Sequence, residues 1–271
     1  MRIRAGYQIT YELPAPTAML LMLSVRPERV TDLESPDTIR TDPVIPVHQY
    51  IDAFGNRCSR IRAPQGRLTL SSDFIIRASD EPDPHVPDAV QHPVEDLPDE
   101  VIVFLLGSRY CEVEQFNDMA WELFGGIADG WAKVQAVCDY AHNSIRFGYE
   151  HARATKTAVE AHQEGQGVCR DYAHLAVTLC RCLNIPARYV TGYLGDIGVP
   201  PSGAAMDFSA WFEVYLGGAW RTFDARHNRR RVGRTVMGVG RDATDVAIST
   251  NFGPAELVDF QVITEELVFA P

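Results

Sequence analysis

The sequence predicts an α+β protein, in which an N-terminal β-sandwich is followed by a second part where helices precede an antiparallel sheet. Three observations support this prediction. Apolar and polar side chains alternate between turn residues from Arg2 to about Ala78, as in short strands. Residues 80–100 are crowded with Pro and Asp, which excludes regular structure and indicates a linker or a long extended arm. Beyond Val101 apolar residues recur at spacings of three and four, and alternation returns from about Tyr189.

The N-terminal strands follow one another between turn signals. They are predicted for residues 3–13, 18–27, 48–64 as a hairpin, and 66–79. The hairpin has Phe54, Gly55 and Asn56 at its turn. We place residues 1–100, the strands with the Pro- and Asp-rich linker, in a first domain and residues 101–271 in a second.

The second part begins with helical periods and ends with strands. Helices are predicted within residues 112–125 and 130–150, and in the latter Trp131, Val134 and Val137 fall on one face. The strands that follow are predicted within residues 187–194, 209–216, 219–225 and 245–253, with a last one from residue 256. We expect these strands to form one antiparallel sheet against the helices.

The composition is that of an ordinary globular protein. Of the 271 residues, 46% are apolar, and the formal net charge at pH 7 is −11. This charge argues against nucleic acid as a partner, because phosphate binding needs clustered Lys and Arg. The one short basic cluster, residues 229–231, is interpreted as a solvated loop.

No membrane or secretory segment is predicted. The longest apolar run, residues 18–25, is far shorter than the ~20 residues that a membrane helix needs. The N-terminus continues as a strand, with no small-residue cleavage site. We therefore expect a cytoplasmic protein without a membrane partner, and the oligomeric state stays open.

The six cysteines show no compact disulfide framework, and a reducing compartment would keep them as thiols. Cys180 and Cys182 form only a C-x-C pair, without the second ligand pair that a structural zinc site needs. No calcium-binding loop pattern is present in the sequence either. We predict neither a metal nor a cofactor.

The most informative cysteine is Cys169, which precedes a run of apolar residues at helical spacing. Unpaired N–H groups at a helix start favour an anion, so we expect a lowered thiol pKa there. Gly165 and Gly167 would let a substrate approach the backbone, and the N–H of Cys169 would help to bind an oxyanion. On composition alone, a small buried filler is the alternative interpretation.

Around this cysteine the sequence reads "GQGVCRDYAHL", then "LNIPARYVTGY", and later "SAWFEVYLGGAWRTFDARHN". Three motifs in this order resemble the bacterial transglutaminase-like superfamily over roughly residues 100–250. The resemblance implies a papain/transglutaminase-like core and a Cys/His/Asp triad that transfers acyl groups from amides. It carries over the nucleophile to Cys169 and the aspartate to Asp224, and it implies a peptide or small amide-bearing substrate.

The histidine of the family pattern does not carry over, because Ser209 occupies its place. A serine hydroxyl cannot act as the general base, and loss of a triad member costs orders of magnitude in rate. Three alternatives stay open: an inactivated thiol enzyme, a silent homologue that binds a peptide or amide ligand, and a lyase-type chemistry in the same pocket. Cys169, Ser209 and Asp224 would line that pocket.

Four further residues are candidates for supporting roles. Gln166 and Gly167 precede the cysteine and Trp211 shares a strand face with Ser209, so all three are predicted to contact the substrate. His227, three residues beyond Asp224, is a possible substitute base. His174 lies about 140° around the helix from Cys169 and is interpreted as a packing residue.

Overall fold

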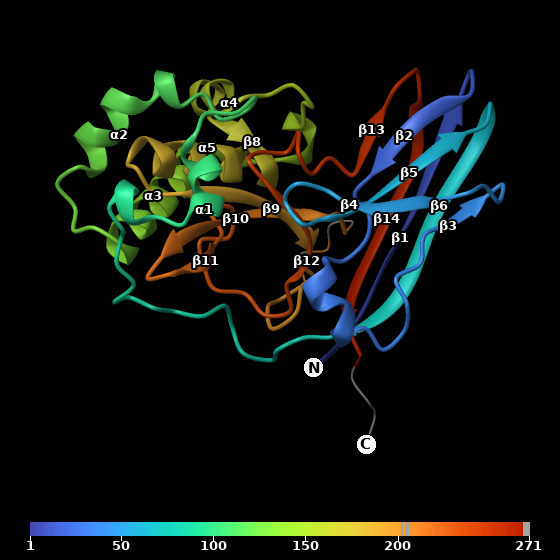
Figure 1. The fold of residues 1–271 in the computed structure, drawn as a ribbon, viewed down its shortest axis with the longest axis horizontal. Helices are drawn as coiled ribbons and strands as arrows, with labels where there is room; N and C mark the ends of the chain where they lie inside the picture. Colours follow the sequence, from blue (N-terminus) through green and yellow to red (C-terminus); the bar gives the residue numbers. More distant parts are fainter. Residues whose placement is uncertain (202, 204–205, 268–271) are drawn as a thin grey trace.

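The computed structural model describes residues 1–201, 203 and 206–267 and confirms the α+β prediction. Two sheets rich in N-terminal strands lie on one side of the molecule, and a third sheet with its helices lies on the other (Figure 1). Because the strands of all three four-stranded sheets pair antiparallel, the core differs from a wound α/β fold.

The first two sheets form the predicted sandwich. One has the order β14-β1-β6-β3, from strands Glu256–Glu266, Arg2–Leu13, Gly66–Arg77 and Arg40–Asp42. The other has the order β13-β2-β5-β4, from strands Ser249–Asn251, Thr17–Leu21, Arg57–Ala63 and His48–Ile51. Alternate side chains such as Ile9, Met19 and Leu70 meet in one apolar cluster between these sheets.

The strand pairing crosses the boundary predicted between residues 100 and 101. Strand β14 pairs along most of β1, with Ile3 opposite Glu266 and Gln8 opposite Gln261. Strand β13 likewise extends the sheet of β2. The prediction that these strands join the sheet of the second part is therefore wrong, because alternation specifies a half-buried strand but not its partner.

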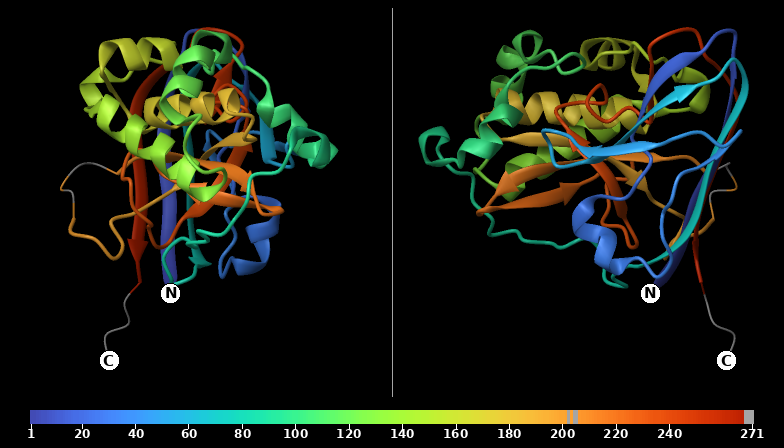
Figure 2. Two further views of the ribbon diagram at one scale, coloured as in Figure 1. Left: turned by 90° about the vertical axis from the view of Figure 1, so that its left-hand side faces the viewer. Right: turned by 45° about the vertical axis from the view of Figure 1, so that its right-hand side comes forward.

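The third sheet has the order β11-β10-β9-β12, from strands Ala219–Phe223, Ser209–Leu216, Ala187–Tyr193 and Thr235–Gly240. Helices cover one of its faces, as two views agree (Figures 1 and 2). They are α1 (Asp99–Ile102), α2 (Asn117–Phe124), α3 (Trp131–Ser144), α4 (Ala158–Glu164) and α5 (Cys169–Cys182). A short parallel pair joins β7 (Arg146–Phe147) to β8 (Gln166–Gly167).

Five 3-10 turns complete the described elements: Pro27–Asp32, Val94–Asp96, Val103–Leu105, Val113–Gln115 and Tyr149–His151. Helix α5 is central, since every residue from Asp171 to Cys182 is buried. Phe212, Val214 and Leu216 of β10 pack in the same cluster as α5, whereas Trp211 packs with Val190 and Val239 on the other face. This alternation confirms the predicted division of the strand into two faces.

Residues 78–98 form an extended arm that runs from β6 past the third sheet to α1 (Figure 1). The arm is bonded to the core at several points. The Trp131 N–H donates to the Ala89 carbonyl (3.2 Å), and the Gly217 N–H donates to the Val90 carbonyl (2.8 Å). The His92 Nε2 accepts from the Gly218 N–H (2.9 Å). Of the two predicted alternatives, a linker or a long extended arm, the structure shows an extended arm that is held along the core.

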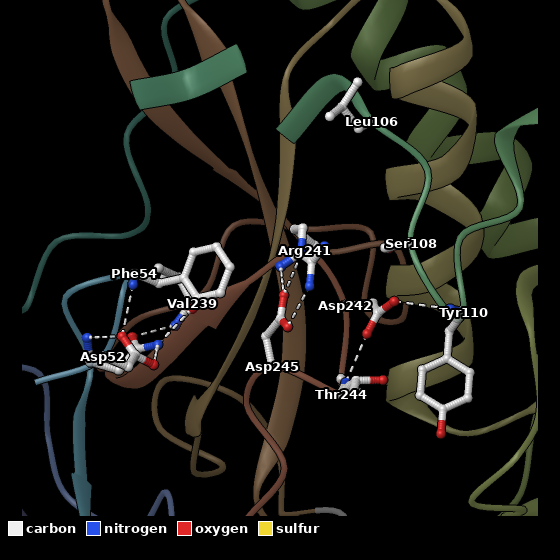
Figure 3. Close-up of polar contacts among 12 residues, drawn as sticks. Asp52, Phe54, Leu106, Ser108, Tyr110, Val239, Arg241, Asp242, Thr244 and Asp245 are labelled. Atoms are coloured by element: carbon white, nitrogen blue, oxygen red, sulfur yellow. Dashed lines mark hydrogen bonds and ion pairs between the residues drawn. The ribbon is translucent and has the colours of Figure 1, made fainter. Parts of the chain in front are cut away.

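The hairpin at residues 48–63 has its turn where the sequence predicted it, and it is hydrogen-bonded to the third sheet. Asn56 is fully buried, and its side chain donates to the carbonyl of Val239 (2.8 Å) and accepts from its N–H (2.9 Å). Asp52 closes the turn by accepting from the N–H groups of Phe54 and Asn56 (both 2.8 Å; Figure 3). The sandwich and the core sheet therefore meet through hydrogen bonds as well as apolar contacts.

A second set of polar contacts holds the loop just beyond β12. The Arg241 guanidinium binds both oxygens of Asp245 (2.9 and 3.0 Å), and Asp242 accepts from the N–H groups of Tyr110 (2.9 Å) and Thr244 (2.8 Å; Figure 3). These contacts fix the loop that follows β12 against the segment before α2.

His174 is a packing residue, as predicted. It is fully buried between the rings of Tyr110 and Tyr189, and its Nε2 accepts from the Ala243 N–H (3.1 Å). Burial lowers its pKa far below 6.5, so the ring is neutral.

Candidate functional site

The predicted nucleophile lies where the sequence placed it, at the first residue of α5. The helix start is closed by Asp171, whose carboxylate accepts from the Val168 N–H (2.9 Å). Cys169 is partly exposed as a residue, and its side chain packs against the cluster that contains Ala173, Tyr189 and Ala210. The Ala210 N–H, on strand β10, is directed at the sulfur.

The expectation of a lowered thiol pKa is wrong for this structure. Burial raises the pKa of Cys169 to about 11 and outweighs the opposing effects of the Arg226 guanidinium and the Ala210 N–H. The negative charge of Asp207 raises the pKa further. At neutral pH Cys169 is therefore a thiol that needs a base before it can attack.

This pKa predicts the reactivity of the free protein toward a neutral alkylating agent. The alkylation rate of Cys169 by iodoacetamide is expected to keep rising up to about pH 11, since only the thiolate reacts. In the urea-unfolded chain the same residue is expected to level off near pH 9, at its ordinary pKa. Peptide mass spectrometry follows each cysteine separately. A folded-state rate that levels off below pH 8 would contradict the raised pKa.

A cavity of about 270 Å³ lies between the start of β10 and the loop after β11, and Cys169 is not one of its wall residues. Two of its wall residues, Arg226 and Asp207, also act on the pKa of the Cys169 thiol, so the cavity lies close to the sulfur. Its walls are formed by Phe147, Tyr149, Leu194, Asp196, Val199, Pro200, Met206, Asp207, Phe208, Ser209, Arg226, His227, Arg229 and Arg231. The cavity thus joins one predicted site residue, Ser209, to the possible substitute base, His227.

His227 and Asp224 form a hydrogen-bonded pair on this side of the sheet. The His227 Nδ1 lies 2.9 Å from Asp224 Oδ2, and the His227 backbone N–H donates to Asp224 Oδ1 (3.0 Å). Arg234 also donates to Asp224 Oδ2 (2.8 Å). The positive charge of Arg234 and the bonds from His227 hold the pKa of Asp224 far below its usual range, despite burial.

This arrangement fixes the tautomer of His227. An ionised carboxylate only accepts hydrogen bonds, so the Nδ1 of His227 carries the proton that it shares with Asp224. In the neutral ring Nε2 is then the acceptor. Asp224, the predicted triad aspartate, therefore orients a histidine that follows it by three residues in the chain.

Arg234 links the site to the arm. Its guanidinium is buried and binds Asp224 and Asp83 (both 2.8 Å), and it lies 4.7 Å from the ring centroid of Trp211. Asp83 also accepts from the Arg231 N–H (2.9 Å). Asp224 is thus held by a charge network that extends across the sheet edge to the arm.

Ser209, which the sequence predicts to occupy the place of the family histidine, is buried at the start of β10. Its hydroxyl has no hydrogen-bond partner, and no hydrogen bond joins it to Cys169 within the described part of the chain. Since a buried hydroxyl is normally satisfied, Ser209 has an unused donor at the wall of the cavity.

The three predicted substrate contacts lie around the site but outside the cavity walls. Gln166, in β8, is partly exposed and accepts from the Arg146 side chain (3.5 Å). Gly167 is buried, and a Cβ there would lie 2.5 Å from the carboxylate of Asp171, so glycine is needed for the helix start. Trp211 is buried beneath Arg234.

Two functional candidates, Arg226 and Asp207, were missed from the sequence. The Arg226 guanidinium lies 3.8 Å from the centroid of the Phe147 ring, and its charge lowers the pKa of the Cys169 thiol. Asp207 combines proximity to Cys169 with a pKa that burial raises. The "DARHN" stretch was a weak signal for Arg226, because it places an arginine between Asp224 and His227.

The remaining observations are the state of the cysteines and the searches for a metal site and for a membrane-spanning helix. All six cysteines are unpaired thiols. Among residues 1–201, 203 and 206–267, no group of three or more His, Cys, Asp or Glu side chains is arranged to hold a metal ion. Over the same residues, no helix has the length and apolar character to cross a bilayer.

Comparison with known proteins places this site in a family context. The model of the Transglutaminase-like superfamily matches residues 117–225, a span that includes Cys169, Ser209 and Asp224. The chain is 30% identical to a Cytophaga hutchinsonii protein whose crystal structure is named "Putative Cysteine Protease", with a TM-score of 0.84 over 100% of this chain and 93% of the other. It is also 27% identical to the uncharacterized protein ML0607 of Mycobacterium leprae, over 77% of each chain.

Proposed function

Because the chain belongs to the transglutaminase-like superfamily, we propose that it is a thiol enzyme that acts on amide bonds with Cys169 as nucleophile. The observation that carries this proposal is the His227–Asp224 pair, whose histidine lines the cavity beside Cys169. It supplies a base that Ser209 cannot supply. Gln166, Gly167 and Trp211 remain proposed substrate contacts around the same site.

The proposed reaction begins with a proton transfer. The Cys169 thiol gives its proton to Nε2 of His227, and the sulfur forms a bond to the carbonyl carbon of the substrate amide. The carbonyl electron pair moves to the oxygen and returns as the carbon–nitrogen bond breaks. The imidazolium then gives the proton to the leaving amine, and Asp224 stabilises the imidazolium in between.

Arg226 and the Ala210 N–H would favour the thiolate during this transfer. Both lower the pKa of the Cys169 thiol against the effect of burial. A substrate that displaces water from the cavity strengthens such electrostatic contacts. The acyl-enzyme then passes its acyl group to water, which makes the protein a hydrolase, or to an amine, which makes it an acyltransferase.

A silent homologue that binds a peptide or amide ligand is the second candidate. Two observations favour it: the raised pKa of Cys169 and the absence of any histidine at position 209. Ser209→His separates the candidates. If the unmodified chain is inactive and Ser209→His gains amidase activity, the site is intact and lacks only a base. If the unmodified chain is already active, the silent homologue is excluded.

The test of the proposed function is a covalent acyl-enzyme. The wild-type chain is incubated with a panel of peptide amides and activated acyl esters, quenched in acid and digested. We expect mass spectrometry to find an acyl group on Cys169 and on none of the other five thiols. Cys169→Ser is the matched control and is expected to carry no thioester. Acylation spread over exposed lysines, with Cys169 unmodified, would contradict the proposal.

We also propose a cytoplasmic location, which six unpaired thiols support, since a reducing compartment preserves thiols. Thiol counting on chain isolated from its native cells without reductant is expected to give six.

A further inference from the structure

The cavity beside Cys169 has a charge opposite to that of the whole chain. The protein has a formal net charge of −11, yet the cavity walls contain the arginines 226, 229 and 231 against the aspartates 196 and 207. His227 adds a group that becomes positive when it accepts a proton. A positive cleft in an acidic protein concentrates anionic ligands.

Two of the three arginines are influenced by the charge of an aspartate in the same walls. The charge of Arg226 lowers the pKa of Asp207, and the charge of Asp196 raises the pKa of Arg231 against the effect of burial. Arg229 is exposed and has no hydrogen bond or ion pair with any residue that the structure describes. One positive charge at the cavity is therefore left without an internal counterion, which favours an anion from outside the chain.

Unsatisfied buried donors lie in the same walls. Arg231 is 3% exposed and donates from one nitrogen to the Gly195 carbonyl (2.7 Å), but its Nε has no partner. The hydroxyl of Ser209, which is 5% exposed, also has no partner. Buried donors of this kind are costly unless a ligand or water accepts from them. Two such groups indicate a ligand with several acceptor oxygens.

We infer that the cavity selects an acyl donor with a carboxylate on its acyl part, which Arg229 and Arg231 bind while the Ser209 hydroxyl donates to an oxygen of the same ligand. The carboxylate and the carbonyl that Cys169 attacks would then belong to the same acyl group, with the carboxylate inside the cavity. Ser209 is then a substrate contact in place of a base. The inference rests on the proposed function for the reaction, but the anion site itself does not depend on catalysis.

The test uses two alkylating agents that differ in charge, iodoacetate and iodoacetamide. Both react with thiolates, so the ratio of their rates at Cys169 reports attraction of a carboxylate to the cavity. The ratio in the urea-unfolded chain serves as the reference. We expect the folded ratio to exceed the reference by about tenfold or more, since a charge-assisted hydrogen bond contributes about 1.5–3 kcal/mol.

Two matched variants locate the effect. Arg229→Gln is expected to reduce the iodoacetate rate at Cys169 by about tenfold and to leave the iodoacetamide rate unchanged. Arg230→Gln removes the same charge from the next residue, which faces a neighbouring cavity and not this one, and is expected to leave both rates unchanged. Equal effects of the two variants, or a folded ratio no higher than the reference, would overturn the inference.

The outcome is separable from that of the acyl-enzyme experiment. Selective labelling by iodoacetate without any acyl-enzyme supports the anion site and contradicts the proposed reaction. An acyl-enzyme that forms equally fast from a carboxylate donor and from its matched carboxamide supports the reaction and overturns the inference.

Discussion

His227→Ala is expected to lower kcat/KM for amide substrates by about 10³-fold, the usual contribution of a general base. The physical reason is that Nε2 of His227 is the acceptor for the thiol proton, because Nδ1 is committed to Asp224 at 2.9 Å. With a thiol pKa of about 11, few molecules carry a thiolate at neutral pH without such a base. Steady-state rates on the substrate that acylates Cys169 most readily provide the measurement.

Added imidazole distinguishes loss of a base from loss of structure. It is expected to restore part of the activity of the His227→Ala protein, whereas His48→Ala, an exposed position on β4, is expected to match the wild type. Asp207→Asn tests the competing explanation that Asp207 is the base, since this carboxyl group also lies near the sulfur and has a raised pKa. Activity that survives His227→Ala and disappears in Asp207→Asn would identify Asp207 as the base.

Arg234→Met is expected to lower the free energy of unfolding by about 3–5 kcal/mol, the cost of breaking a buried ion pair by removing one partner. The arginine side chain is 6% exposed and lies between Asp83 and Asp224, whose own side chains are 13% and 1% exposed. Without Arg234, Asp83 loses this partner, and His227 alone faces the Asp224 carboxylate. Urea unfolding at pH 7 measures the change.

The matched control for this variant is Arg241→Met. Arg241 also donates two hydrogen bonds to carboxylate oxygens, both of them on Asp245, but its side chain is 41% exposed. An exposed ion pair contributes at most about 1 kcal/mol, so the control is expected to unfold close to the wild type. If both variants lose less than about 1 kcal/mol, the network around Asp224 does not stabilise the fold in the way that its burial implies.

The sequence predicted those parts of the site that depend on local pattern. Cys169 stands at a helix start because glycines precede it and apolar residues follow at helical spacing, and β10 has the predicted bounds of residues 209–216. Arg226 and Asp207 were missed because no local pattern distinguishes a charged loop residue that tertiary packing brings to a sulfur.

Strand β12 and helix α4 are among the elements that were also missed. Strand β12 contains Gly238 and Gly240, which weaken its alternation, and the structure gives the reason for one of them. A Cβ on Gly240 would lie 2.5 Å from the side chain of Asp245. Helix α4 has only seven residues, too few for a clear period, and it depends on the capping box between Thr157 and Glu160. The thiol pKa depends on burial, which composition near Cys169 does not reveal.

The pairing of β1 with β14 has a consequence for biosynthesis. A ribosome releases β1 early and β14 only after the complete transglutaminase-like core, so one edge of β1 stays unpaired on the nascent chain until then. An unpaired apolar strand edge is a template for aggregation. The core, in contrast, has all four of its strands before β13 is made. Translation therefore favours folding of the core first. The sandwich is completed last, when β14 pairs with β1.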